Sequence, residues 1–194
     1  MTHFEENRNI LEKISSKIDQ EIPLDMEVPT TKSVYYVESE NEIVALSLCN
    51  LNLKELPREI VNLTELVVLK IAGNSLRSVP NIIKDLPKIS ILDISNNQIG
   101  EVPKWIGDLV NLRELRLNNN QLYSLPSSIG KLSLLRRIFL QSNSIHSLPR
   151  ELLDLQLLEE IHLDFRSTIR KSMKMILSNL ESNGCTVENN YNRR

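Results

Sequence analysis

The chain has 194 residues, enough for one domain with a substantial buried core. Its formal net charge of −2 provides no basic field, which argues against nucleic acid or an anionic membrane as a partner. Only 4% of the residues are aromatic whereas 41% are hydrophobic, so the composition predicts a core of leucine, isoleucine and valine. The sequence has no run of about 18 apolar residues, and it therefore predicts no membrane-spanning helix.

The N-terminal part predicts a helix followed by a strand. Residues 4–19 place four apolar side chains on one helical stripe: Ile10, Leu11, Ile14 and Ile18. Residues 34–37 resemble a strand that turns at Glu40–Asn41 and runs antiparallel to the strand after it. We expect residues 1–42 to cap the rest of the domain. A partner-binding or membrane-surface helix is the alternative for such an amphipathic segment.

The middle of the chain repeats every 23 residues. Six units start at Ile43, Leu66, Ile89, Leu112, Leu135 and Leu158. Apolar residues occupy places 1, 4, 6, 11, 18 and 21 of a unit, and place 15 is proline in five units: Pro57, Pro80, Pro103, Pro126 and Pro149. Places 4 and 6 alternate with more polar neighbours, which predicts one strand per unit in a parallel sheet. Proline suits the first residue of a short helical turn, which would face the sheet.

An asparagine recurs at place 9 of four units: Asn74, Asn97, Asn120 and Asn143. After each strand the chain must turn, which leaves backbone groups without sheet partners. Because an amide both donates and accepts, we expect each asparagine to bond the turn of its own unit and the backbone of the next. The first and last units have Leu51 and Arg166 at this place, consistent with a terminal unit that has only one neighbour.

This pattern resembles the leucine-rich repeat, in the 23-residue form that carries "LP" before its second half, and it spans Ile43 to Leu163. The resemblance implies an α/β fold, a curved leucine-rich repeat solenoid with a parallel β-sheet on its concave face and short 3₁₀ or α turns on its convex face. We assign residues 43–165 to the solenoid, as five full repeats and a partial sixth. Similar proteins mostly bind proteins, and the LP-type forms include scaffolds around small GTPases and phosphatases. A small GTPase or another signalling protein is therefore a candidate partner.

Residues 166–194 predict a second cap. A helical stripe of five apolar residues consists of Ile169, Met173, Ile176, Leu177 and Leu180. Gly184 ends this helix, and "CTVE" after it predicts a short edge strand before a loose tail.

The sequence contains no phosphate-binding glycine loop and no nucleophile-elbow motif, so we expect no enzymatic activity and no cofactor. His162 and Asp164 share a strand face but would need a third ligand to hold a metal, and we interpret them as surface residues. Cys49 and Cys185 belong to opposite ends of the solenoid, too far apart for a disulfide. We expect a cytoplasmic protein, with secretion as the alternative.

Places 3, 5 and 7 should project from the concave sheet into solvent. Toward the N-terminus they are small or aliphatic, as in the strip Ala45, Val68 and Ile91, and toward the C-terminus they are charged or aromatic. We predict a partner-binding site made of Arg116, Arg137, Phe139, Gln141, Glu160 and His162. The alternatives are the N-terminal strip as the footprint, a Phe139 that is shielded by arginine stems, and simple surface salt-bridge ladders, Lys70–Asp93–Arg116 and Glu114–Arg137–Glu160.

The sequence thus predicts a non-catalytic, monomeric module that binds a folded protein partner on its concave sheet. The second hypothesis is a secreted bacterial effector or adhesion factor that binds a host protein. A structural unit that self-associates through its ends is the third.

Overall fold

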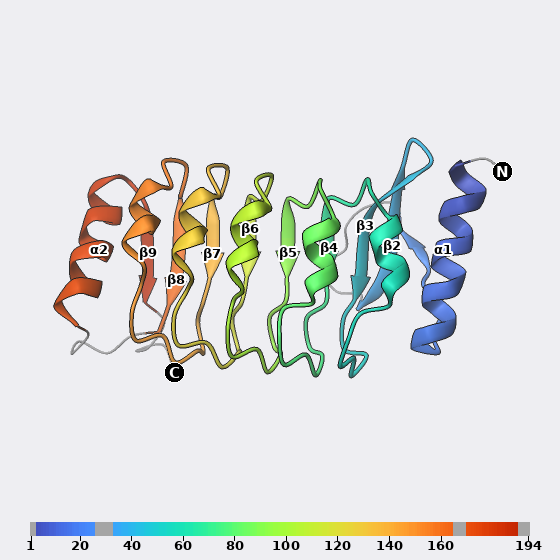
Figure 1. Ribbon diagram of the computed structural model, residues 1–194, viewed down its shortest axis with the longest axis horizontal. Coiled ribbons are helices and arrows are strands. Elements are labelled where there is room, and N and C mark those ends of the chain that lie inside the picture. The colour runs from blue at the N-terminus through green and yellow to red at the C-terminus, as the bar shows by residue number, and fades with distance from the viewer. Residues whose placement is uncertain (1–2, 26–32, 165–169, 190–194) are drawn as a thin grey trace.

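The computed structural model of the protein describes residues 3–25, 33–164 and 170–189. Within these residues a single sheet holds nine strands in chain order, from β1 at one end to β9 at the other, and it does not close on itself (Figure 1). The strands are β1 (Leu24–Asp25), β2 (Val34–Ser39), β3 (Glu42–Leu48), β4 (Val68–Lys70), β5 (Ile91–Asp93), β6 (Glu114–Arg116), β7 (Arg137–Phe139), β8 (Glu160–Leu163) and β9 (Thr186–Asn189). Neighbouring strands are parallel except for β2 and β3, which are antiparallel. The prediction of one parallel strand per repeat is confirmed for β3 to β8.

A short 3₁₀ helix follows the proline at place 15 of each of the first five units, and these helices cover one face of the sheet (Figure 1). The five helices are η1 (Arg58–Asn62), η2 (Asn81–Asp85), η3 (Lys104–Asp108), η4 (Ser127–Lys131) and η5 (Arg150–Asp154). Each proline stands one residue before its helix, and its carbonyl accepts the first helical hydrogen bond, as from the Ile60 N–H to Pro57 O at 3.2 Å. Proline therefore fixes the backbone of the residue that precedes the helix. The sequence predicted proline as the first helical residue, and this position was wrong by one residue.

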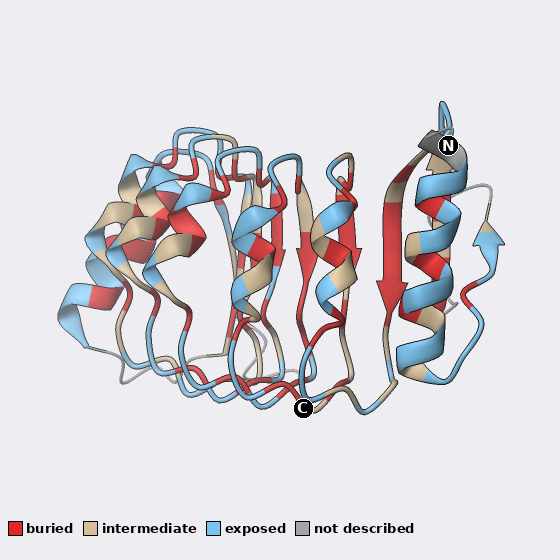
Figure 2. Cartoon of the chain, turned by 45° about the vertical axis from the view of Figure 1, so that its right-hand side comes forward, coloured by how far each residue is buried: buried red, intermediate tan, exposed pale blue. Residues whose placement is uncertain are grey.

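The core lies between the strands and these helices, and it runs through all the repeats (Figure 2). In the fourth unit, every side chain at the six apolar places is fully buried: Leu112, Leu115, Leu117, Leu122, Ile129 and Leu132. The repeating pattern thus corresponds to one continuous hydrophobic layer. We call the sheet face opposite the 3₁₀ helices the open face.

The recurring asparagines link neighbouring repeats. The Asn120 amide donates to Ile94 O and to Leu117 O, both at 3.0 Å, and its oxygen accepts the Ile99 N–H at 2.9 Å. Asn74, Asn97 and Asn143 repeat this arrangement. The bonded neighbour is the preceding repeat, so the predicted link to the next repeat has the wrong direction. The first unit has no preceding repeat, and its Leu51 N–H instead donates to Asn74. Arg166 lies outside the described residues.

The residue at place 8 of the first five units, just before the asparagine place, has a left-handed backbone, which the sequence pattern was not used to predict. The φ angles at this eighth place range from 53° to 69° in Asn50, Gly73, Asn96, Asn119 and Ser142. Asparagine and glycine tolerate this conformation better than most residues. The turn after each strand is therefore set by two adjacent places, one for the backbone angle and one for hydrogen bonds.

Helix α1 (His3–Ile18) lies against the first repeat. Leu11 and Ile14 are buried in the common core, and Ile10 and Ile18 pack against it. The Asn7 amide donates to Asn41 O at 3.0 Å, at the predicted turn between the antiparallel strands β2 and β3. The apolar stripe of this helix is thus occupied by the solenoid itself.

Helix α2 (Lys171–Ser182) lies beyond the last repeat and contributes four predicted residues to the core: Met173, Ile176, Leu177 and Leu180. Ile169, the fifth member of the predicted stripe, lies outside the described residues. Strand β9 then pairs with β8 in parallel, as the expected edge strand. Both ends of the row of repeats are therefore covered by helices that bury their apolar sides (Figure 1).

Candidate functional site

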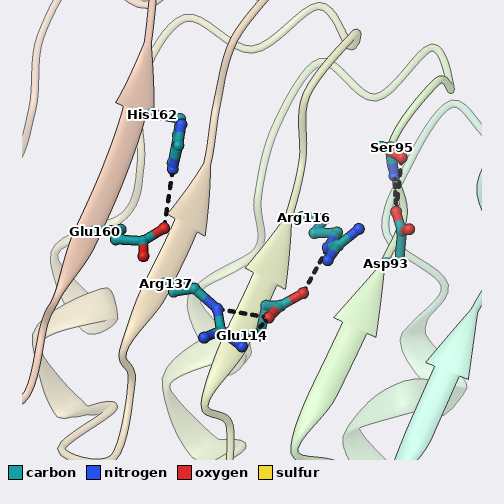
Figure 3. Close-up of polar contacts among 7 residues, drawn as sticks. All are labelled: Asp93, Ser95, Glu114, Arg116, Arg137, Glu160 and His162. Carbon is teal, nitrogen blue, oxygen red and sulfur yellow. Dashed lines mark hydrogen bonds and ion pairs between the residues drawn. The ribbon is translucent and has the colours of Figure 1, made fainter. Parts of the chain in front are cut away.

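Three neighbouring strands bring most of the predicted site residues together on the open face. The sheet register places Arg137 between Glu114 and Glu160, and places Phe139 between Arg116 and His162. Because strands β6, β7 and β8 are in identical frame, these six residues form two adjacent columns of three. Figure 3 shows all of them except Phe139. We call these six residues the charged grid.

Glu114 is the centre of the charged grid, although it was not among the predicted site residues. Its side chain is only 4% exposed, whereas those of Arg116 and Arg137 are 45% and 42% exposed. The carboxylate accepts a hydrogen bond from Arg116 Nε at 2.5 Å, and it contacts Arg137 Nε at 2.8 Å and Nη2 at 2.6 Å (Figure 3). One buried carboxylate therefore orients two arginines.

The charge state of Glu114 follows from these contacts. Burial raises the pKa of Glu114, but hydrogen bonds from Arg137 and Arg116 lower it more, so its pKa lies below the ordinary value of a glutamate. The same carboxylate raises the pKa of Arg137. Glu114 is thus ionised at neutral pH, and its negative charge lies between two guanidinium groups.

Phe139 is half-buried because both faces of its ring are covered. The ring stacks on His162 with centroids 4.5 Å apart and planes at 19°, and the guanidinium carbon of Arg116 lies 5.1 Å from its centroid. Arg116 and His162 come from the two strands that flank Phe139, so they cover opposite ring faces. Phe139 is accordingly not the freely exposed anchor that the sequence suggested. The ring is shielded, but by one arginine guanidinium and the ring of His162, and not by arginine stems alone.

The remaining predicted residues border this stack. His162 Nε2 lies 3.2 Å from Glu160 Oε2 (Figure 3). Gln141 follows Phe139 by two residues and is half-buried, and its side-chain oxygen has no hydrogen-bond partner within the described residues. Asp164 accepts the Ser142 N–H at 2.7 Å, so this carboxylate serves the turn after β7. Within the described part of the chain, no group of three or more candidate ligands is arranged to hold a metal ion.

The N-terminal half of the open face differs from the prediction. The strip expected to be solvent-facing contains Ala45 and Val68, which are only 1% and 8% exposed, and they cluster with Tyr35 and Val37 from β2. The strip is therefore buried apart from the half-buried Ile91, and the prediction that it is exposed is wrong. Strand β2 lies outside the repeat, so the repeating pattern carried no signal for this cluster.

Tyr35 is the centre of this second cluster and is fully buried. Burial is the main cause that raises its pKa to about 12. The Lys70 ammonium lies 5.7 Å from its ring centroid. Asp93, which was expected in a charge ladder, accepts hydrogen bonds from the Ser95 N–H at 3.0 Å and from the Ser95 hydroxyl at 2.6 Å (Figure 3). Ser95 and the ring of Tyr35 are therefore contacts of Asp93 and Lys70 that the ladder interpretation did not include.

The two cysteines are free. Cys49 follows β3 and is half-buried, and Cys185 precedes β9 at the other end of the sheet and is buried. Of the helices in the described residues, none combines the length and the apolar character needed to cross a bilayer.

A parallel sheet with one strand per 23-residue unit, backed by short helices, defines a solenoid repeat protein. Two family models support the same class: a leucine-rich repeat region matches residues 33–120, and a single leucine-rich repeat matches residues 111–132. The chain belongs to the leucine-rich repeat family. No curated protein sequence matches it significantly.

Solved structures show the same fold. A leucine-rich repeat protein of Leptospira interrogans is 33% identical over 75% of this chain, with a TM-score of 0.68. The ectodomain of the Arabidopsis thaliana receptor kinase GASSHO1/SCHENGEN3, solved with CASPARIAN STRIP INTEGRITY FACTOR 2, is 36% identical over 57% of the chain, with a TM-score of 0.51. The functional domain of InlJ from Listeria monocytogenes is 17% identical over 63%, with a TM-score of 0.53, and shows the fold alone. The chain covers only 36%, 14% and 26% of these three proteins.

Proposed function

We propose that this protein is a non-catalytic binding module, which holds a folded protein partner on the C-terminal half of its open face. The observation that carries the proposal is the charged grid, in which one buried carboxylate orients two half-exposed arginines beside a stacked aromatic ring. Leucine-rich repeat domains are in general protein-interaction modules, and the plant ectodomain was solved in complex with CASPARIAN STRIP INTEGRITY FACTOR 2. A small GTPase or another signalling protein is the partner class that we favour.

The physical support is preorganisation. Interface hot spots are enriched in arginine and aromatic residues. Free arginine side chains lose rotamer entropy when a partner fixes them, on the order of 0.5–1.5 kcal/mol each. Here Glu114, Phe139 and the neighbouring strands already restrict Arg116 and Arg137 in the free protein. Binding of a partner therefore costs less side-chain entropy, because folding has already restricted these arginines.

The test is affinity capture from a native lysate of the source organism. The variant combines Phe139→Ala with Arg137→Ala, which removes one ring and one cation from the open face. The matched control combines Val110→Ala with Lys131→Ala, since these residues are 54% exposed and 67% exposed at the side chain, respectively, and lie outside the sheet. We expect the open-face pair to reduce capture at least tenfold and the control pair to leave it unchanged. Equal capture by both variants would remove the basis for the proposal.

We also propose that the protein works in a reducing compartment, the cytoplasm, and as a monomer. Two free cysteines at opposite ends of the sheet support the first point. The helices that cover both ends support the second, because they occupy the surfaces through which repeats would stack. Detection of the chain in culture medium would instead favour a secreted effector or adhesion factor. A mass that rises with concentration in light scattering would favour self-association.

A further inference from the structure

We infer that the partner presents an acidic side chain, an aspartate or glutamate on a surface loop, which is held by Arg116 and Arg137 beside the edge of Phe139. This inference rests on the proposed function and names the partner chemistry of the same site. It follows from three features of the charged grid: the donors that remain open, the orientation of the ring and the local charge.

The first feature is the set of donors that Glu114 leaves open. The contacts with Glu114 engage Nε of Arg116, and Nε and Nη2 of Arg137. A guanidinium has five N–H donors in one plane. Within the described residues, the terminal nitrogens of Arg116 and Nη1 of Arg137 have no other hydrogen-bond or ion-pair partner, and both side chains are more than two-fifths exposed. Two planar donor groups on adjacent strands can therefore hold a carboxylate from one side.

The second feature is the orientation of Phe139. Arg116 and His162 cover its two faces, so the exposed part of the ring is its edge. The edge of an aromatic ring carries partial positive charge, whereas its face carries partial negative charge. Phe139 thus presents the electrostatic pole that attracts an oxygen atom, next to the two guanidinium groups. An apolar partner side chain would find both ring faces already occupied.

The third feature is the local charge. Glu114, Arg116 and Arg137 sum to a formal charge of +1, which one carboxylate neutralises. Asp93 neighbours Arg116 in the sheet register, and Glu160 neighbours Arg137. A doubly charged phosphate group would face these two carboxylates with an excess negative charge. Glu160 offsets the +1 of these three residues, so the six-residue grid has a formal charge of zero, and its two arginines accommodate one added negative charge better than two.

The experiment uses a phage library of random twelve-residue loops, each closed by a disulfide so that it imitates a surface loop of a folded protein. The full chain is the bait, and loops that lose binding to the Phe139→Ala, Arg137→Ala double variant are retained as open-face binders. Each retained loop is then resynthesised with Asp changed to Asn and Glu changed to Gln. We expect these amide versions to bind at least tenfold more weakly. We also expect Arg116→Gln to weaken the acidic loops at least fivefold, and Lys131→Gln, which removes the same charge far from the site, to leave them unchanged.

The outcomes separate the two proposals. If open-face binders are found but their amide versions bind equally well, the acidic-partner inference is wrong and the proposed function stands. If the library contains no loop that depends on the open-face residues, both are rejected. If Lys131→Gln weakens binding as much as Arg116→Gln, attraction by the overall charge of the protein replaces the specific site.

Glu114→Gln provides a second and opposite test of geometry. This substitution makes the open face more positive by one charge, so simple attraction predicts tighter binding of acidic loops. The inferred site predicts at least threefold weaker binding, because the arginines lose the carboxylate that orients them. Circular dichroism and a urea midpoint establish that the variant is folded, and tighter binding by the folded variant would overturn the inference.

Discussion

Asn120→Asp is the substitution that most directly tests how the repeats are held together. The side chains have nearly the same size, but the amide donates two protons and the carboxylate donates none. In the structure these protons go to Ile94 O and Leu117 O, both at 3.0 Å, and the side chain is only 8% exposed. The substitution therefore removes two buried hydrogen bonds without creating a cavity.

The magnitude follows from what each carbonyl keeps. Ile94 O still accepts from the Asn97 amide at 3.1 Å, and Leu117 O still accepts from the Asn143 amide at 2.9 Å. Neither carbonyl becomes fully unsatisfied, so each loss costs the net value of a hydrogen bond, about 0.5–1.5 kcal/mol. The sum is about 1–3 kcal/mol, toward the upper end at neutral pH because the new carboxylate faces two carbonyl oxygens. The deficit should shrink as the pH falls and the carboxyl regains a donor.

Urea unfolding of the two variants Asn120→Asp and Asn118→Asp, followed by circular dichroism, measures this difference. Asn118 lies two residues earlier on the open face and is half-buried, so its change to aspartate should cost less than about 0.5 kcal/mol. The m-values should agree, because both variants expose the same surface on unfolding. Equal urea midpoints for the two variants would refute a structural role for the asparagine column.

Other substitutions and reagents test neighbouring features. Gly107→Ala should lower the free energy of unfolding in urea by about 1–3 kcal/mol, because the new Cβ would lie 2.3 Å from a backbone oxygen of the next repeat. Gly100→Ala should be nearly neutral, because no heavy atom lies within 4 Å of its Cβ position. Similar costs for the two variants would contradict this packing. The pKa of Glu114 is lowered on folding, so its ionisation stabilises the protein above its unfolded pKa of about 4.3, and this contribution is lost as the pH falls through the folded pKa. Glu114→Gln should therefore flatten the stability–pH curve below about pH 4.5, and an unchanged curve would contradict the assignment. Iodoacetamide at pH 8 should modify Cys49 before Cys185, because burial raises the pKa of Cys185 to about 11; mass spectrometry that finds the reverse order would refute the burial.

The repeating part of the fold was predictable because each structural role returns at the same place. Several units share leucine at the apolar places, proline before the helix and asparagine after the strand. The 23-residue period therefore predicts the positions of six strands, β3 to β8. The direction of the asparagine link was not predictable, since an amide can form the same hydrogen bonds with the preceding repeat or with the next one. The left-handed eighth place was visible in the sequence as repeated asparagines, and those asparagines were the missed signal.

The candidate site was harder to predict, because its properties depend on residues that do not repeat. Alternating charges showed that salt bridges would form, but they did not show that Glu114 is the buried member and that the arginines are half-exposed. The exposed aliphatic strip was wrongly predicted because Tyr35 comes from β2, outside the repeat. Phe139 was found, but its environment depends on the ring and guanidinium of the two neighbouring strands.

The third place of the repeat contains an internal comparison that bears on function. In the first three units this place is Ala45, Val68 and Ile91, and in the next three it is Glu114, Arg137 and Glu160. The same sheet therefore forms with aliphatic residues at this place where Tyr35 and Val37 of β2 cover them, and with charged residues where β2 does not reach. A buried carboxylate between two arginines also carries a desolvation cost that apolar replacements avoid, and it is weak evidence for stability. A charged arrangement that carries this cost is consistent with the proposed binding surface on the fourth to sixth repeats.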